Sequence, residues 1–313
     1  MTPACGASWL ARLRVRGPLW PLALFRIGFG LALLVQTLVE AGRHAAYAPE
    51  RFHLPLVPLL AAPSAPVFAM LIRLALLSAI ATILGAGSRI AVVVLTLVHG
   101  YLFAVDSLLF RNHVYAALLL GGLLALSPCG QVLSFDALMR RMRRRPPRPR
   151  EGSLVVAQLI KGQVWIIYLW SALNKLRPSF LDGWVFQQEL PALLREGLLA
   201  RWLNDRGTSA MWVILDDDAR TAALAWSVLL VELFIAVGIM HRRLRPWACA
   251  CGLTLHVGIF LSMNVFTFGC LLVASYPLFL ASPRSPPLTA CTAKARADST
   301  RAPVPALPTV PRP

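Results

Sequence analysis

Eight long apolar stretches, separated by short polar or arginine-rich segments, constrain the fold of this 313-residue chain more than any other feature. Several of them approach the ~20 apolar residues that a helix needs to cross a bilayer, whereas residues 113–126 form a short stretch. With 57% hydrophobic and only 14% charged residues, the composition is typical of a protein embedded in lipid. Because the stretches lack strict alternation of apolar and polar residues, they predict helices rather than the strands of a barrel. The stretches are residues 21–40, 67–86, 90–110, 113–126, 153–176, 221–240, 246–263 and 266–280. The sequence therefore predicts an all-α, polytopic transmembrane helical bundle of about eight spans, a multi-pass protein of the cell membrane.

Arginine accounts for 28 of the 31 basic residues behind the net charge of +17, and most of the arginines lie in segments outside the apolar stretches. Arginines precede the first stretch, and others follow the second, fourth and sixth, so all of them fall on one side of the membrane if there are eight spans. Positively charged loops stay in the cytoplasm, which predicts that both termini are cytoplasmic. A nucleic-acid-binding role is not expected, because there is no basic helix with interleaved aromatic residues. The six cysteines form no CxxC pattern, and no metal site is expected.

The segments outside the apolar stretches suggest four further regions. Residues 1–20 form a basic cytoplasmic N-terminus, and residues 139–152 form an arginine- and proline-rich cytoplasmic loop that contacts anionic headgroups. Residues 177–220 form an acidic extracytoplasmic loop, in which leucines at helical spacing predict one amphipathic helix on the outer membrane surface; a plain solvated loop is the alternative. Residues 283–313 are rich in Pro, Ala, Ser and Thr and predict a disordered tail. The transmembrane domain is thus expected to span residues 21–282.

Lys175 is the most informative polar residue, because it ends the apolar stretch 153–176. An ionisable group at such a position is a candidate for function, although its side chain could instead extend to the headgroups. Lys161, Tyr168 and Ser171 share a helical face with Lys175. That face either lines a cavity or forms hydrogen bonds that fix helix packing.

Other polar residues stand singly inside the apolar stretches. Glu232 must be protonated or paired in such surroundings. His99 and Asp106 are seven residues apart and are expected to form a structural pair. Arg26 lies near the cytoplasmic end of its stretch, where snorkelling to the headgroups is a sufficient explanation; the same ambiguity applies to Arg73 in the second stretch. The remaining candidates for a cavity are His256 and Asn264, at the outer half of the seventh stretch. No hydrolase triad, P-loop or haem motif is present.

Three segments carry a more specific pattern, in which polar residues recur in a fixed order along the apolar helices. They are Arg111-Asn112-His113-Val114-Tyr115 followed by Ala125-Leu126-Ser127-Pro128 and Leu133-Ser134-Phe135-Asp136; Ser171-Ala172-Leu173-Asn174-Lys175-Leu176 followed by Asp182-Gly183-Trp184; and His256 to Phe279 with Met263-Asn264 and Phe268. In this order they resemble the transmembrane part of vitamin K-dependent gamma-carboxylase and its bacterial relatives, the horizontally transferred transmembrane (HTTM) family. Phe25-Arg26-Ile27-Gly28 is similar to the start of the family's first helix. The resemblance covers roughly residues 20–281.

The resemblance implies a quinol-dependent carboxylase or epoxidase, a lyase whose cofactor is reduced vitamin K or a related quinol. Lys175 matches the family's base, which must be a neutral amine. Asn112 and His113 match the pair that hydrogen-bonds substrate or quinone oxygens. Tyr168, Ser171, Glu232, His256 and Asn264 are then candidates to line the substrate and quinone cavity, and a dry cavity protects reactive intermediates from water.

Two departures from the carboxylase pattern leave other functions open. Asn174 stands where the carboxylase has a second lysine, and only about thirty residues follow the last stretch, where the carboxylase has a large extramembrane domain. A partner protein is therefore expected to supply that domain if a protein is the substrate. The alternatives are a non-catalytic membrane subunit and a transporter of a lipid or small solute; the latter lacks an inverted repeat.

Overall fold

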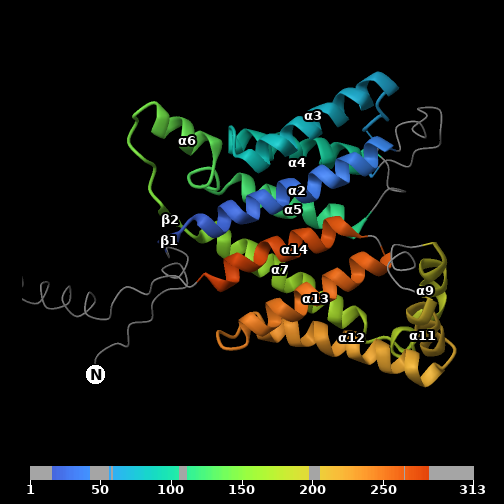
Figure 1. Cartoon of the computed structure of the whole chain (residues 1–313). Helices are drawn as coiled ribbons and strands as arrows, with labels where there is room; N and C mark the ends of the chain where they lie inside the picture. The colour runs from blue at the N-terminus through green and yellow to red at the C-terminus, as the bar shows by residue number, and fades with distance from the viewer. Residues whose placement is uncertain are drawn as a thin grey trace, which may run out of the picture. The chain divides into compact units, whose positions relative to one another are not determined.

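The computed structural model describes residues 16–42, 56–57, 59–105, 111–196, 205–263 and 265–281, and these are mostly helical (Figure 1). The bundle consists of α2 (Trp20–Gly42), α3 (Ala65–Leu84), α4 (Ser88–Val105), α5 (Asn112–Ala125), α7 (Val155–Asn174), α12 (Asp218–Gly238), α13 (Arg245–Met263) and α14 (Phe266–Leu280). Shorter helices lie between them: α6 (Phe135–Met142), α8 (Pro178–Leu181), α9 (Trp184–Glu196) and α11 (Asp205–Leu215). The helices expected from the apolar stretches are therefore present, with ends that differ by a few residues.

Five of the described helices, α2, α3, α4, α7 and α12, are long and apolar enough to cross a bilayer, and α5 and α14 are shorter apolar helices. Their outer faces carry exposed apolar side chains, among them Leu77, Leu97 and Val237, each about two-thirds exposed. Such faces are stable in lipid and costly in water. The chain is thus a multi-pass helical membrane protein, and eight spans with cytoplasmic termini remain a prediction.

Helix α14 holds the bundle together, because it packs against α2, α5, α7 and α13 (Figure 1). It is almost entirely apolar, as expected for a helix surrounded by protein. The core that it shares with its neighbours is closely packed, and Phe25, Phe29, Leu120, Ile160 and Phe279 are each at most 2% exposed. This core positions α7, which carries Tyr168 and Ser171 and ends at Lys175, and α13, which carries His256.

Arg26 does not extend to the membrane surface, and the snorkelling interpretation is wrong. Its side chain is 0% exposed, and its guanidinium donates hydrogen bonds to the carbonyl oxygens of Cys129 at 3.0 Å and Leu133 at 2.6 Å. A third contact, to the carbonyl of Ile83, is 3.5 Å long. The segment after α5 folds back over α2 and offers these carbonyls, so the arginine finds acceptors inside the protein. Arg73, in contrast, is exposed.

Capping residues fix the helices at the arginine-rich ends of the bundle. Helix α3 ends at Gly85, whose φ of 74° lies in the left-handed region that suits glycine. Helix α6 begins after Ser134, whose hydroxyl accepts a hydrogen bond from the Ala137 amide at 3.1 Å. Asp136 then accepts a hydrogen bond from the Gly87 amide at 3.0 Å, which ties α6 to the α3–α4 turn.

A short antiparallel ladder, which the apolar pattern does not predict, joins the two arginine-rich segments. Strand β1 (Arg16–Pro18) pairs with β2 (Glu151–Ser153), with Gly17 opposite Gly152. Gly152 lies against the buried Leu19, and a Cβ there would come within 3.1 Å of the leucine side chain. The ladder therefore joins the start of α2 to the start of α7.

The segment between α7 and α12 differs from the single amphipathic helix expected there. It contains α8, α9 and α11, and the apolar side chains Leu190, Leu194 and Leu215 form a separate buried cluster. Leu224 of α12 packs against this cluster. The apolar face is thus covered by protein within the described residues; Leu198, Leu199 and Trp202 lie outside them.

Gly183, between α8 and α9, lies where the backbone conformation and the neighbouring helix leave no room for a side chain. Its φ is 84°, and a Cβ would come within 2.5 Å of the Thr221 backbone. Gly183→Ala is therefore expected to lower the free energy of unfolding by about 1–3 kcal/mol, since both strain and overlap arise. Thermal unfolding of detergent-purified protein measures the effect. Gly162→Ala is the control, because nothing lies within 4 Å of a Cβ at that helical position. An equal unfolding temperature for the two variants would contradict this account.

Candidate functional site

Lys175 lies in a compact polar cluster between α7 and α12. Its Nζ donates hydrogen bonds to both carboxylate oxygens of Glu232, at 2.8 and 3.0 Å, and to the hydroxyl of Ser171 at 2.8 Å. The Ser171 hydroxyl also lies 3.2 Å from Glu232 Oε1. Three residues that the sequence singled out are therefore brought together, and Glu232 is paired.

The position of this cluster follows from where α7 ends. Lys175 is the C-terminal capping residue of α7, and Ser171 precedes it by one turn, so both side chains occupy one face. The lysine side chain is 23% exposed and the Glu232 side chain 6% exposed. The Phe180 ring, from α8, covers the ammonium at 5.6 Å from its centroid. Lys175 is thus turned toward the protein rather than extended to the headgroups.

A second, more deeply buried polar group links α7, α13 and α14. The hydroxyl of Tyr168 lies 2.7 Å from His256 Nε2 and 2.6 Å from the hydroxyl of Tyr276. All three side chains are at most 5% exposed. Tyr168 and His256 were both expected at the site, whereas Tyr276 was not. Its position next to Ser275 in an otherwise apolar helix was the only sequence signal.

His256 retains one unused polar atom. Its Nδ1 is buried and has no hydrogen-bond partner among the described residues. The ring of Phe268 meets the imidazole edge-on, with centroids 5.9 Å apart, and Gly269 leaves room for the histidine Cβ. Buried polar atoms are normally satisfied. Within the described residues, His256 Nδ1 is therefore an exception to this rule.

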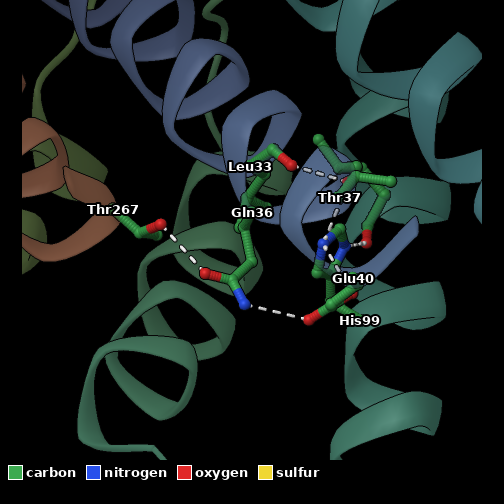
Figure 2. A network of polar contacts seen from close by, with 7 residues as sticks. Leu33, Gln36, Thr37, Glu40, His99 and Thr267 are labelled. Atoms are coloured by element: carbon green, nitrogen blue, oxygen red, sulfur yellow. Dashed lines mark hydrogen bonds and ion pairs between the residues drawn. The ribbon is translucent and has the colours of Figure 1, made fainter. Parts of the chain in front are cut away.

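A third polar network, shown in Figure 2, joins α2, α4 and α14. Gln36 lies between Thr267 and Glu40, accepting a hydrogen bond from the former at 2.9 Å and donating to the latter at 3.0 Å (Figure 2). His99 lies 3.2 Å from the Thr37 hydroxyl and 3.8 Å from Glu40. His99 thus faces Thr37 and Glu40 of α2, while its Nδ1 lies 3.0 Å from the carbonyl oxygen of Leu95 on α4. The expected pairing with Asp106 lies outside the described residues. Interhelical hydrogen bonds of this kind hold helices together in lipid.

The remaining predicted site residues have fewer contacts with described residues. Asn112 and His113 begin α5, with Asn112 exposed and His113 half-buried, and neither side chain forms a hydrogen bond or ion pair with a described residue. They are therefore not hydrogen-bonded to Lys175. Lys161 lies 5.9 Å from the ring centroid of Phe279, at the other end of α7. Asn264 falls outside the described residues.

The polar clusters can hold and transfer protons within an apolar bundle. The Lys175 cluster combines an ammonium, a carboxylate and a hydroxyl, and the Tyr168 group combines two phenols with an imidazole.

Comparison with known protein families gives one match: the model of the HTTM domain matches residues 19–283. No solved structure matches the chain.

Proposed function

Because the chain belongs to the HTTM family, we propose that it is a quinol-handling membrane enzyme, related in chemistry to the vitamin K-dependent carboxylases, in which Lys175 acts as the base. The single observation that carries this proposal is the pairing of Lys175 with Glu232 and Ser171. The proposed topology has eight spans in the cell membrane, with both termini and the 139–152 loop in the cytoplasm. It is supported by the arginines that fall together on one side.

The lysine–glutamate pair explains how an amine at this position serves as a base. Transfer of the shared proton from Lys175 to Glu232 leaves a neutral amine, which has the lone pair that a base needs. The Ser171 hydroxyl remains within hydrogen-bond distance of both groups and holds them in place. After that transfer, the Lys175 amine can accept the proton of a quinol hydroxyl.

The donor set fits a reduced quinone, which when bound supplies a hydroxyl proton and reducing equivalents. Lys175 would receive the hydroxyl proton, and Asn112 and His113 would donate hydrogen bonds to oxygen atoms. The side chains of Asn112 and His113 have no competing hydrogen bond or ion pair with a described residue, so they can donate hydrogen bonds to a ligand. The exposed apolar faces of the helices suit a partner that arrives through the lipid.

Quinone epoxide formation by purified protein tests the proposal. With reduced vitamin K and oxygen supplied in nanodiscs, wild type is expected to form epoxide, and Lys175→Ala is expected to reduce the rate by about 100-fold or more, the usual contribution of a general base. Lys161→Ala is the matched control, because it removes a lysine from the same helix without touching the cluster. Full turnover by a folded Lys175→Ala protein would refute the assignment.

A second function, that of a non-catalytic membrane subunit, is favoured by a different aspect of the same cluster. Lys175 is already hydrogen-bonded to three oxygen atoms, and the pair joins α7 to α12 as an interhelical link. In that case wild type alone forms no epoxide, and tagged protein copurifies with a stable partner.

A further inference from the structure

A cavity of about 510 Å³ lies at the arginine-rich ends of α4 and α5, apart from the Lys175 cluster. Its walls come from the α3–α4 turn, the segment between α5 and α6, and the 139–152 loop. The residues that matter for its chemistry are Ser88, Arg89, Ser127, Cys129, Asp136 and Arg148. The carbonyl contacts of Arg26 hold the segment after α5 in place and so fix one wall of this cavity.

Two buried hydroxyls line the cavity. Ser88 and Ser127 are each 3% exposed; the Ser88 Oγ has no hydrogen-bond partner among the described residues, and the Ser127 Oγ lies near the Cys129 thiol but has no nitrogen or oxygen partner there. Ser88 begins α4, whose first amides are also directed toward this end of the helix. Buried hydroxyls without partners are rare, because each costs roughly 1–3 kcal/mol of lost hydration. A ligand that offers several acceptor oxygens would satisfy both.

The charges around the cavity favour an anion. Arg89 and Arg148 are exposed and line it, whereas the one lining carboxylate, Asp136, is already hydrogen-bonded to the Gly87 amide. Burial raises the pKa of the Cys129 thiol, and this outweighs the opposing effects of the Ser127 hydroxyl and of Arg26. The thiol is therefore neutral and adds no negative charge. Two arginines and two hydroxyls together suit the oxygens of a phosphate group.

The surroundings of the cavity are those of a membrane surface. Ile90, which lines the cavity, is 72% exposed, and Leu126, next to Ser127, is 70% exposed. On α6, the exposed side chains Phe135, Leu138 and Met142 recur at helical spacing, opposite Arg140 and Arg141, as in helices that lie in the headgroup layer. We propose that this cavity binds the phosphate group of an anionic phospholipid, with its acyl chains over the neighbouring apolar side chains.

Lipid retention measured by native mass spectrometry tests this proposal. Detergent-purified protein is mixed with phosphatidylglycerol or phosphatidylcholine, and bound lipid is counted. Wild type is expected to prefer phosphatidylglycerol, and Arg89→Ala/Arg148→Ala is expected to weaken that binding about tenfold, since two charge-assisted contacts are lost. Ser88→Ala is expected to weaken it less. Arg145→Ala is the matched control, an exposed arginine of the same loop that does not line the cavity.

The source of the phosphate is settled by adding inorganic phosphate as a competitor. Displacement of lipid only at high phosphate concentration, together with the loss in the arginine variant, would support a lipid site. Binding of inorganic phosphate without any preference for phosphatidylglycerol would overturn it. Equal lipid binding by the cavity variants and Arg145→Ala, with equal unfolding temperatures, would also overturn it.

Discussion

Replacing Arg26 with alanine is expected to lower the free energy of unfolding by about 3–5 kcal/mol, the combined cost of unsatisfied carbonyl oxygens and of a large-to-small substitution in a core. The Arg26 guanidinium is fully buried and donates to the carbonyls of Cys129 and Leu133 at 3.0 and 2.6 Å. Alanine would leave those carbonyls without donors and open a cavity in the core. Thermal unfolding in detergent measures the effect, and loss of the folded peak in size-exclusion chromatography would accompany it.

Arg73→Ala provides the matched control, because it removes an arginine from a neighbouring helix at an exposed position. Its unfolding temperature is expected to stay close to that of wild type. Arg26→Lys is expected to fall between the two, since an ammonium keeps the charge but reaches fewer of the carbonyls in the same geometry. Similar unfolding temperatures for Arg26→Ala and Arg73→Ala would show that the carbonyl contacts contribute little.

Arg26 also shows why the sequence predicted the helices better than their contacts. Apolar runs define helices locally, and α14 begins and ends where its apolar stretch does. The acceptors of Arg26, in contrast, lie more than fifty residues away along the chain. Only the folding back of the segment after α5 brings them close. A charged residue near a predicted helix end is therefore ambiguous until the tertiary structure is known.

In the candidate site, too, the sequence predicts which residues share a helical face but not which residues they contact. The common face of Tyr168, Ser171 and Lys175 follows from helical spacing alone, and the requirement that Glu232 be either protonated or paired follows from its isolation in an apolar run. That Lys175 is the partner does not follow, because 57 residues separate the two. Tyr276 was missed for the opposite reason: a tyrosine in an apolar helix is compatible with simple packing, and only the structure shows its hydroxyl beside Tyr168.

The resemblance to a family implies residue roles that neither spacing nor packing would suggest. It drew attention to the Asp182-Gly183-Trp184 segment, and the structure gives a physical reason for it. Asp182 accepts a hydrogen bond from the Trp184 amide at 2.9 Å, and Gly183 takes a left-handed conformation against the Thr221 backbone. These residues hold α9 against α12, the helix that carries Glu232. The segment thus supports the site rather than contacting it.

A set of variants of Lys175 and Glu232 would separate a catalytic role from a structural one. Lys175→Met leaves a carboxylate that is 6% exposed without its partner, and Glu232→Leu leaves an ammonium that is 23% exposed. Each is expected to lower the free energy of unfolding by about 3 kcal/mol, the usual cost of removing one member of a buried pair. The cost of Lys175→Met is expected to be the larger, because the stranded carboxylate is more buried.

The double variant Lys175→Met/Glu232→Leu is expected to recover most of that stability, since apolar side chains of similar volume replace buried ion pairs at little cost. Epoxide formation, in contrast, is expected to be absent from all three variants if the pair transfers a proton. A double variant that is stable but forms no epoxide would therefore show that the pair takes part in the reaction, because the loss of activity could not be due to a loss of folding. A double variant that forms epoxide at the wild-type rate would restrict Lys175 and Glu232 to linking α7 with α12.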